Sequence, residues 1–167
     1  MRVRDRYRRF GGALLCLLPA LVVLAGTPAN AESGPFSPLA GSWSGGGEVN
    51  MSDGSADRLR CRATYSVGGG GTSATLNLRC ASDSYNFNLN GNVRSQAGNV
   101  SGTWTEETRG IGGTVSGTAS GNSISLQVIG PTFAAGLALS VNGNKQAISI
   151  SAPASEIRSA SISLTKS

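Results

Sequence analysis

Apolar residues recur at every second position along most of the chain, which is the period of a strand with one buried face. The clearest example covers residues 58 to 80, where two alternating runs flank a stretch of four glycines. Folding these runs back so that Cys61 faces Cys80 also places Tyr65 opposite Leu76. One register satisfies every apolar pair, so the pattern predicts a disulfide-stapled β-hairpin.

About ten such runs follow one another beyond residue 40 at intervals of roughly 8 to 12 residues, without a helical period. Turn signals such as Asp53-Gly54 and Asn142-Gly143 separate them. Short turns favour pairing in chain order, so we predict an all-β fold, an up-and-down antiparallel β-barrel of about 8 to 10 strands. A two-sheet β-sandwich is the alternative. An outer-membrane barrel is a third possibility, which a polar outer face and 5% aromatic residues disfavour.

The first 31 residues have the pattern of a secretory signal peptide. Five arginines lie within the first nine residues, an apolar run covers residues 13 to 25, and Ala29-Asn30-Ala31 forms a small-x-small exit. The apolar run is too short to span a bilayer, so we expect no membrane-spanning segment after signal removal; an uncleaved amphipathic anchor is the alternative. We predict a signal peptide at 1–31, a flexible lead-in at 32–40 whose Phe36 or Leu39 plugs one end of the fold, and a single barrel domain at 41–167.

The predicted leader carries most of the net charge. The full chain has 14 basic and 9 acidic residues and a formal charge of +5, but nine basic and eight acidic residues remain once the leader is removed. A nearly neutral domain does not favour binding to nucleic acid. Export predicts a periplasmic or secreted monomer in which Cys61 and Cys80 stay oxidised. Closing that loop is expected to contribute about 3 kcal/mol to stability.

Residues for enzymatic chemistry are scarce. The chain has no histidine, the commonest general base and metal ligand. Glu106 continues the alternating face of Trp104; it is either an acid inside the barrel, paired with a ligand or an arginine, or, as the favoured alternative, a strand-end carboxylate in solvent. The glycine clusters at 68–71 and 110–113 lack the helix and lysine of a phosphate loop and are expected to be turns. We therefore expect no enzymatic activity, no cofactor and no metal.

Two sets of residues are candidate binding sites. Inward aromatic side chains suit a small apolar or amphipathic ligand: Trp43, Tyr65, Tyr85, Phe87, Trp104 and Phe133. A row of outward arginines suits phosphate or carboxylate groups, or an envelope component: Arg58, Arg60, Arg62 and Arg79. The favoured alternative for this row is internal pairing with nearby acids, with Glu48 falling near Arg60 or Arg62. The sequence predicts a ligand-binding module or, alternatively, an envelope interaction or protease-inhibitor-like protein that acts through its outer surface.

Several of the residues predicted to face inward are small, so the sequence alone does not determine the interior volume. Gly102, Gly117, Ala119 and Ala135 share the apolar face of their predicted strands. A barrel of about ten strands is wide enough for a cavity unless large side chains fill it. These positions therefore indicate either a roomy pocket or a tightly flattened barrel.

The triplet Gly41-Ser42-Trp43, at the start of the first predicted strand, resembles the opening of the calycins, the group of lipocalins, fatty-acid-binding proteins and avidins. In lipocalins such a tryptophan closes the barrel floor beneath a basic residue from a late strand, and the resemblance implies Arg158 as that partner. The triplet recurs as Gly102-Thr103-Trp104. The wider pattern of Gly-x-Trp-x-Gly, Cys-x-x-x-Tyr, Leu-x-Cys-Ala-Ser and Gly-x-Trp-x-Glu also resembles uncharacterised exported proteins of rhizobial-type bacteria. That resemblance implies a compartment and no activity.

Overall fold

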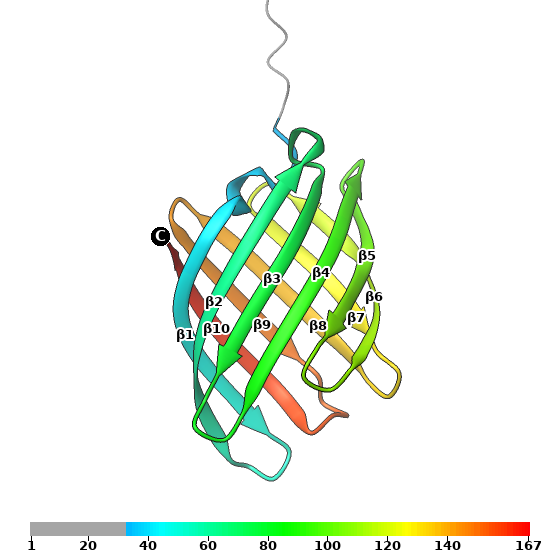
Figure 1. Ribbon diagram of the computed structural model, residues 1–167. Helices are drawn as coiled ribbons and strands as arrows, with labels where there is room; N and C mark the ends of the chain where they lie inside the picture. The colour runs from blue at the N-terminus through cyan, green and yellow to red at the C-terminus, as the bar shows by residue number, and fades with distance from the viewer. Residues whose placement is uncertain (1–32) are drawn as a thin grey trace, which may run out of the picture. The chain divides into compact units, whose positions relative to one another are not determined.

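Ten antiparallel strands form one closed barrel in the computed structural model, which describes residues 33 to 167 (Figure 1). The predicted signal peptide lies outside the described residues. Each strand pairs with its neighbours in chain order, and β10 closes onto β1. The strands are β1 (Gly41–Met51), β2 (Ala56–Gly68), β3 (Ser73–Ala81), β4 (Asn86–Gln96), β5 (Asn99–Glu106), β6 (Ile111–Ser120), β7 (Ser123–Ile129), β8 (Ala134–Asn142), β9 (Lys145–Ser151) and β10 (Ile157–Lys166). The all-β barrel prediction is confirmed, and the sandwich alternative is wrong.

Alternate side chains along each strand point into the barrel, as the hydrophobic pattern predicts. In β2 the buried positions are Leu59, Cys61, Ala63 and Tyr65, separated by exposed arginine and threonine residues. The same pattern in the other strands places the buried apolar side chains in one core cluster, with four exceptions: Trp104, Val115, Ala135 and Ala152. Of the large apolar residues among positions 33 to 167, Ile129 is the exposed one, at 45%. The outer face is therefore polar and the inner face apolar.

The β2–β3 hairpin has the predicted register. Cys61 lies opposite Cys80, and Arg62 lies opposite Arg79 on the other face of the same two strands. The cysteine sulfurs are bonded at 2.08 Å, and both cysteines are buried. The disulfide is compatible with an oxidising compartment.

The β1–β2 hairpin differs from the expectation in its register. Glu48 lies opposite Arg58, and not beside Arg60 or Arg62. The connection between the two strands covers residues 52 to 55. The observed pairing is centred on Asp53, one residue earlier than a pairing of Glu48 with Arg60 would require.

The two ends of the barrel differ in how they are closed. The upper end in Figure 1 carries the 3₁₀ turns η1 (Ser37–Leu39) and η2 (Gly69–Gly71). We call residues 34 to 40, which lie across this end, the covering segment. Its Phe36 and Leu39 are buried, at 1% and 3% exposure. The prediction that Phe36 or Leu39 plugs one end is therefore confirmed for both residues. No helix within residues 33 to 167 is long and apolar enough to cross a bilayer.

Candidate ligand-binding site

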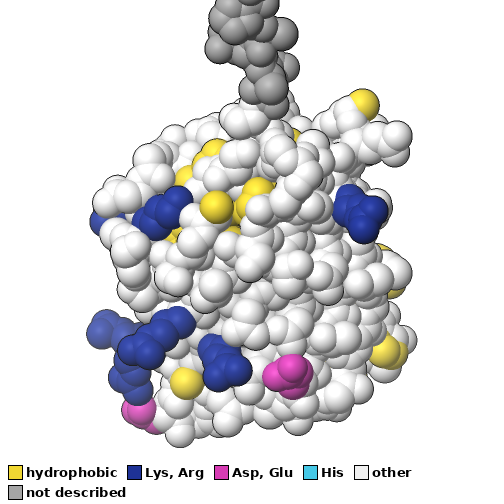
Figure 2. Space-filling model, turned by 45° about the horizontal axis from the view of Figure 1, so that its top comes forward, with side chains coloured by type: hydrophobic (Ala, Val, Ile, Leu, Met, Phe, Trp, Pro, Cys, Tyr) yellow, Lys and Arg dark blue, Asp and Glu magenta, His cyan; other side chains and the backbone are white. Residues whose placement is uncertain are grey.

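An apolar cavity of about 110 Å³ lies inside the barrel next to the covering segment. Its walls come from the inward faces of β2 to β8 and from Phe36 and Leu39. Most of the lining is aliphatic and includes Leu76, Leu89, Val93, Leu126, Leu137 and Leu139. Among the described residues, no charged side chain lines it. In Figure 2 the upper end is tilted toward the viewer, and apolar side chains are visible there. Such a lining favours apolar groups over charged ones.

Two of the six predicted aromatic residues line this cavity, Tyr65 from β2 and Trp104 from β5. The indole N–H of Trp104 donates to the carbonyl oxygen of Ile129 at 3.1 Å. The ring of Trp104 packs against Phe133 with centroids 5.6 Å apart and an interplanar angle of 51°. Phe133 therefore supports the cavity wall from behind Trp104. Four of the predicted residues are not part of the lining: Trp43, Tyr85, Phe87 and Phe133.

Tyr65 forms a buried polar pair with Gln146 of β9. The Nε2 of Gln146 donates to the Tyr65 hydroxyl at 2.8 Å. Burial raises the pKa of Tyr65 to about 12, although the hydrogen bond from Gln146 acts in the opposite direction. The Tyr65 hydroxyl is therefore neutral at physiological pH. The Oε1 of Gln146 has no hydrogen-bond partner among residues 33 to 167. The sequence analysis missed Gln146, although alternation with Ile148 and Ile150 places it on the inward face.

Trp43 holds the covering segment and does not line the cavity. Its indole N–H donates to the carbonyl oxygen of Leu39 at 2.7 Å. The Nζ of Lys166 lies 5.4 Å from the centroid of the Trp43 ring and 3.4 Å from the carbonyl oxygen of Pro38. The implied partner Arg158 is therefore wrong. Because β1 and β10 are antiparallel, the start of β1 lies beside the end of β10, where Lys166 pairs with Trp43.

Glycines allow the covering segment to lie directly on the β2–β3 loop. The backbone N–H of Gly34 donates to Gly70 at 2.7 Å, and that of Phe36 donates to Gly71 at 3.0 Å. A Cβ atom on Gly34 would lie 2.8 Å from the backbone nitrogen of Thr72, and even closer to Gly71. Gly69 to Gly71 of the four-glycine run thus form a turn, as expected, and their lack of side chains also makes room for the covering segment. The second glycine cluster is not a turn beyond Gly110, because β6 begins at Ile111.

We expect Gly34→Ala to loosen the covering segment while the barrel stays folded, because residue 34 lies outside the strands. Amide hydrogen exchange of the non-proline residues between positions 36 and 40 should accelerate by about tenfold or more, measured by mass spectrometry. Gly136→Ala is the matched control, because its Cβ would meet only Gln127 Nε2, at 4.0 Å. Unchanged exchange in Gly34→Ala would show that the contact with Gly71 does not hold the segment.

The lower end contains Glu106, which is inside the barrel and only 1% exposed. The favoured expectation of a solvent-exposed carboxylate is wrong. The carboxylate accepts backbone N–H groups from Asn88 at 3.0 Å, Thr108 at 3.0 Å and Arg109 at 2.9 Å, and the Arg109 guanidinium lies 3.3 Å away. Burial raises the pKa of Glu106, but these hydrogen bonds outweigh burial and lower it to about 2. Glu106 is therefore ionised, and it closes the β5–β6 loop.

Tyr85 and Phe87 belong to this lower end. The guanidinium carbon of Arg109 lies 4.4 Å from the centroid of the Tyr85 ring. Burial raises the pKa of Tyr85, while the charge of Arg109 counteracts it. Phe87 lies opposite Cys80 and packs against the core. Within residues 33 to 167, no group of three or more Cys, Asp or Glu side chains is arranged to hold a metal ion.

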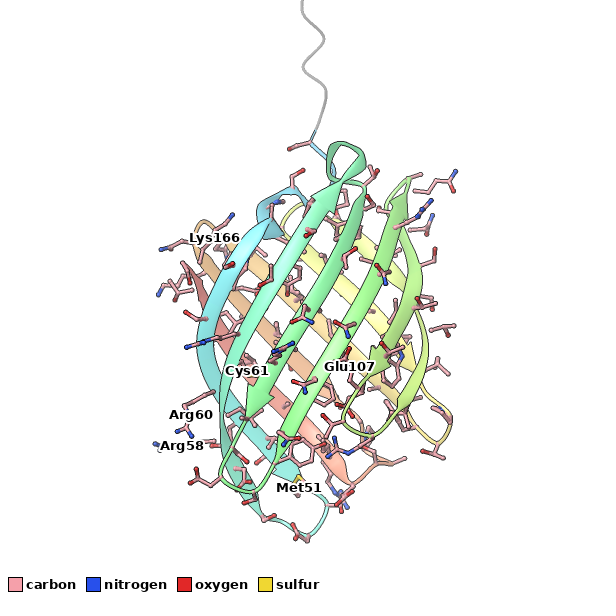
Figure 3. The ribbon with its side chains drawn as sticks, in the orientation of Figure 1. Met51, Arg58, Arg60, Cys61, Glu107 and Lys166 are labelled. Atoms are coloured by element: carbon pink, nitrogen blue, oxygen red, sulfur yellow. A yellow bond between two sulfur atoms is a disulfide. The ribbon has the colours of Figure 1, made fainter. Side chains whose placement is uncertain are left out.

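The four predicted surface arginines project from the outer face of β2 and β3, where Figure 3 labels Arg58 and Arg60. Arg60 forms an ion pair with Asp83 at 3.6 Å, but the two side chains are 81% and 100% exposed. An exposed pair of this kind contributes little to stability. Among the residues described, no ion pair involves Arg62 or Arg79.

The barrel resembles several solved structures. One is Rv2717c from M. tuberculosis, with a TM-score of 0.63 and 18% identity over 78% of this chain and 94% of that one. Another is the S-type phycobiliprotein lyase CPES from Guillardia theta, with a TM-score of 0.58 and 7% identity over 79% of this chain and 90% of that one. No protein-family model and no curated protein matches the sequence. The likeness concerns the fold alone, which is a closed antiparallel β-barrel.

Proposed function

We propose that this chain is an exported, non-enzymatic binding module for a small apolar or amphipathic ligand. The observation that carries the proposal is the apolar cavity bordered by Tyr65 and Trp104. The fold shared with a phycobiliprotein lyase supports a ligand-binding barrel. The leader pattern, the resemblance to exported proteins of rhizobial-type bacteria and the Cys61–Cys80 bond support the location.

The volume of the cavity determines the size of the ligand. An apolar cavity of roughly 150 Å³ binds benzene. A cavity of about 110 Å³ therefore accommodates a smaller group, such as the end of a short alkyl chain. Tyr65 is a buried lining residue that offers a hydroxyl, and it is suited to a ligand with one polar end. Phe36 and Leu39 limit longer ligands, because they occupy the adjoining space.

A series of straight-chain alcohols from propanol to octanol tests this proposal. Affinity, measured by tryptophan fluorescence and calorimetry, is expected to rise by about 0.8 kcal/mol for each CH₂ until the cavity is full, and then to stop rising. Leu126→Phe should fill the cavity from β7 and weaken binding by about tenfold or more, because the ligand loses its space.

Ile129→Phe is the control on the same strand, because Ile129 is 45% exposed and does not line the cavity. Its binding should match that of the parent protein. Saturable binding that is equally strong in Leu126→Phe, or no saturable binding of any alcohol, would reject the cavity as the ligand site.

A further inference from the structure

The outer face of β2 to β5 joins the arginine row to a polar groove. Arg62 and Arg79 lie opposite each other, and the next outward row toward the upper end contains Thr64, Asn77 and Asn90. Beyond that row lies a groove of about 690 Å³ over the same four strands. Its outward lining residues include Thr75, Asn92, Ser101, Thr103 and the basic Arg94. In Figure 2 basic side chains gather at the lower left of the molecule, away from the apolar groups of the upper end.

The facing arginines carry a positive charge that the barrel does not neutralise. Like charges directly opposite each other in an antiparallel pair repel and destabilise it. The neighbours of the pair across the ladder are Ser44 beside Arg62 and Asn88 beside Arg79, and neither is acidic. The adjacent disulfide fixes the two strands in this register. Arg60 therefore has an acidic partner in Asp83 and Arg58 lies opposite Glu48, but no acidic residue lies opposite either member of the facing pair.

The groove extends this charge along the strands. Arg94 lies opposite Ser73, six residues along β3 from Arg79, which corresponds to about 20 Å of extended strand. The side chains between them are short hydroxyls and amides that already form cross-strand hydrogen bonds, at 2.6 Å between Asn77 and Asn90. Short polar side chains leave the groove open and present donors and acceptors to a ligand.

We propose that this face binds an acidic polysaccharide. Carboxylates of the polymer contact the Arg62–Arg79 pair and Arg94, and its hydroxyl groups hydrogen-bond in the groove between them. Arginine forks suit carboxylates, and a chain with repeated charges and many hydroxyls matches two basic positions joined by a polar groove. A lipid surface fits less well, because the exposed large apolar residue of the described chain is Ile129 on β7, outside this face.

Binding of alginate, with neutral dextran and anionic phospholipid vesicles as comparisons, tests the proposal at low ionic strength. The double variant Arg62→Gln, Arg79→Gln should bind alginate about tenfold more weakly or worse, because two charge-assisted contacts are lost. The control is the double variant Lys145→Gln, Arg158→Gln, which removes the same amount of charge from β9 and β10. It should change the affinity for alginate by less than about threefold. Loss of repulsion should keep the unfolding midpoint of the first double variant at or above that of the parent.

A second variant addresses the groove without changing the charge. Ser101→Trp places a large ring on an exposed outer position of the groove, away from the interior cavity, and should weaken alginate binding while leaving the binding of short alcohols to that cavity unchanged. The proposal would be overturned if the parent does not bind alginate, or if it binds dextran equally well or the vesicles more tightly. Equal losses of affinity in the two double variants would also overturn it.

Discussion

Gly117→Ala is expected to destabilise the barrel by about 4 kcal/mol, enough to unfold a marginally stable domain. Gly117 lies on the inward face of β6, opposite Leu126 of β7. A Cβ at this position would lie 2.8 Å from the Cα of Leu126 and would overlap the backbone oxygen of Ser125. Both obstacles are backbone atoms of a paired strand, so rotation of a side chain cannot relieve the overlap. Urea unfolding followed by circular dichroism measures the loss.

Gly136→Ala is the matched control for this change. Gly136 also lies within a strand, but the nearest atom to its Cβ position is Gln127 Nε2, at 4.0 Å. We expect its stability to stay within about 0.5 kcal/mol of the parent. Similar stabilities of the two variants would show that the close approach of β6 and β7 does not require glycine.

The same close approach recurs at other inward glycines and explains the small interior. A Cβ would overlap a backbone oxygen of the neighbouring strand at Gly45, Gly47, Gly102 and Gly113. Glycines at these positions therefore allow the strands to coil tightly and do not enlarge a pocket. Ala74 and Gly91, in contrast, line the cavity. None of the four small residues singled out from the sequence lines the cavity, and at Gly102 and Gly117 the interpretation of a tightly flattened barrel is the one that fits.

The alternation of side chains was sufficient to predict the strands and one complete register. A period of two assigns each residue to a face, and the two cysteines leave one pairing of β2 with β3 that buries every apolar residue. The same alternation identifies Gln146 as inward. The β1–β2 register was not predictable, because it depends on the length of a turn whose Asp53 carboxylate binds Ser55 at 2.8 Å.

The alternation of side chains does not predict the position of a residue along the barrel axis. Trp43 and Tyr65 both face inward, but Trp43 lies at the covering segment and Tyr65 lies at the cavity, while Tyr85 lies outside the strands, in the β3–β4 connection at the lower end. The depth of a side chain in the barrel depends on the tilt of the strands and on which strand ends meet when β10 closes onto β1. For the same reason the cation over Trp43 is Lys166 and not Arg158.

Together, these positions separate the roles of the two ends. The cover lies at the upper end and depends on Trp43, Gly34 and Gly71, and the cavity extends from this cover down to Leu89, which pairs with Glu106. The lower end holds no part of the covering segment, and its loop is fixed by the buried charge of Glu106. A change at Glu106 should therefore act directly on the stability of this loop.

Glu106→Gln is expected to destabilise the fold by about 3 kcal/mol at pH 7. Glutamine keeps the shape of the side chain, but it turns an N–H₂ group toward the Arg109 N–H that one carboxylate oxygen accepts at 2.9 Å. The folded-state pKa of Glu106, about 2, lies below its ordinary value of 4.5. Ionised Glu106 therefore stabilises the fold fully above about pH 4.5, and this stabilisation is lost as the pH falls toward 2. Urea unfolding between pH 7 and pH 2 measures the difference between variant and parent.

Glu107→Gln supplies the comparison, because it makes the same chemical change at the adjacent, exposed position that Figure 3 labels. The Glu107 carboxylate accepts one hydrogen bond from Asn90 at 2.7 Å in contact with solvent, so we expect a loss below about 1 kcal/mol at pH 7. The stability gap between parent and Glu106→Gln should narrow below pH 4.5 and close near pH 2, where the parent also carries a protonated side chain. A gap that stays constant over this range would mean that packing of the side chain, and not its charge, holds the β5–β6 loop.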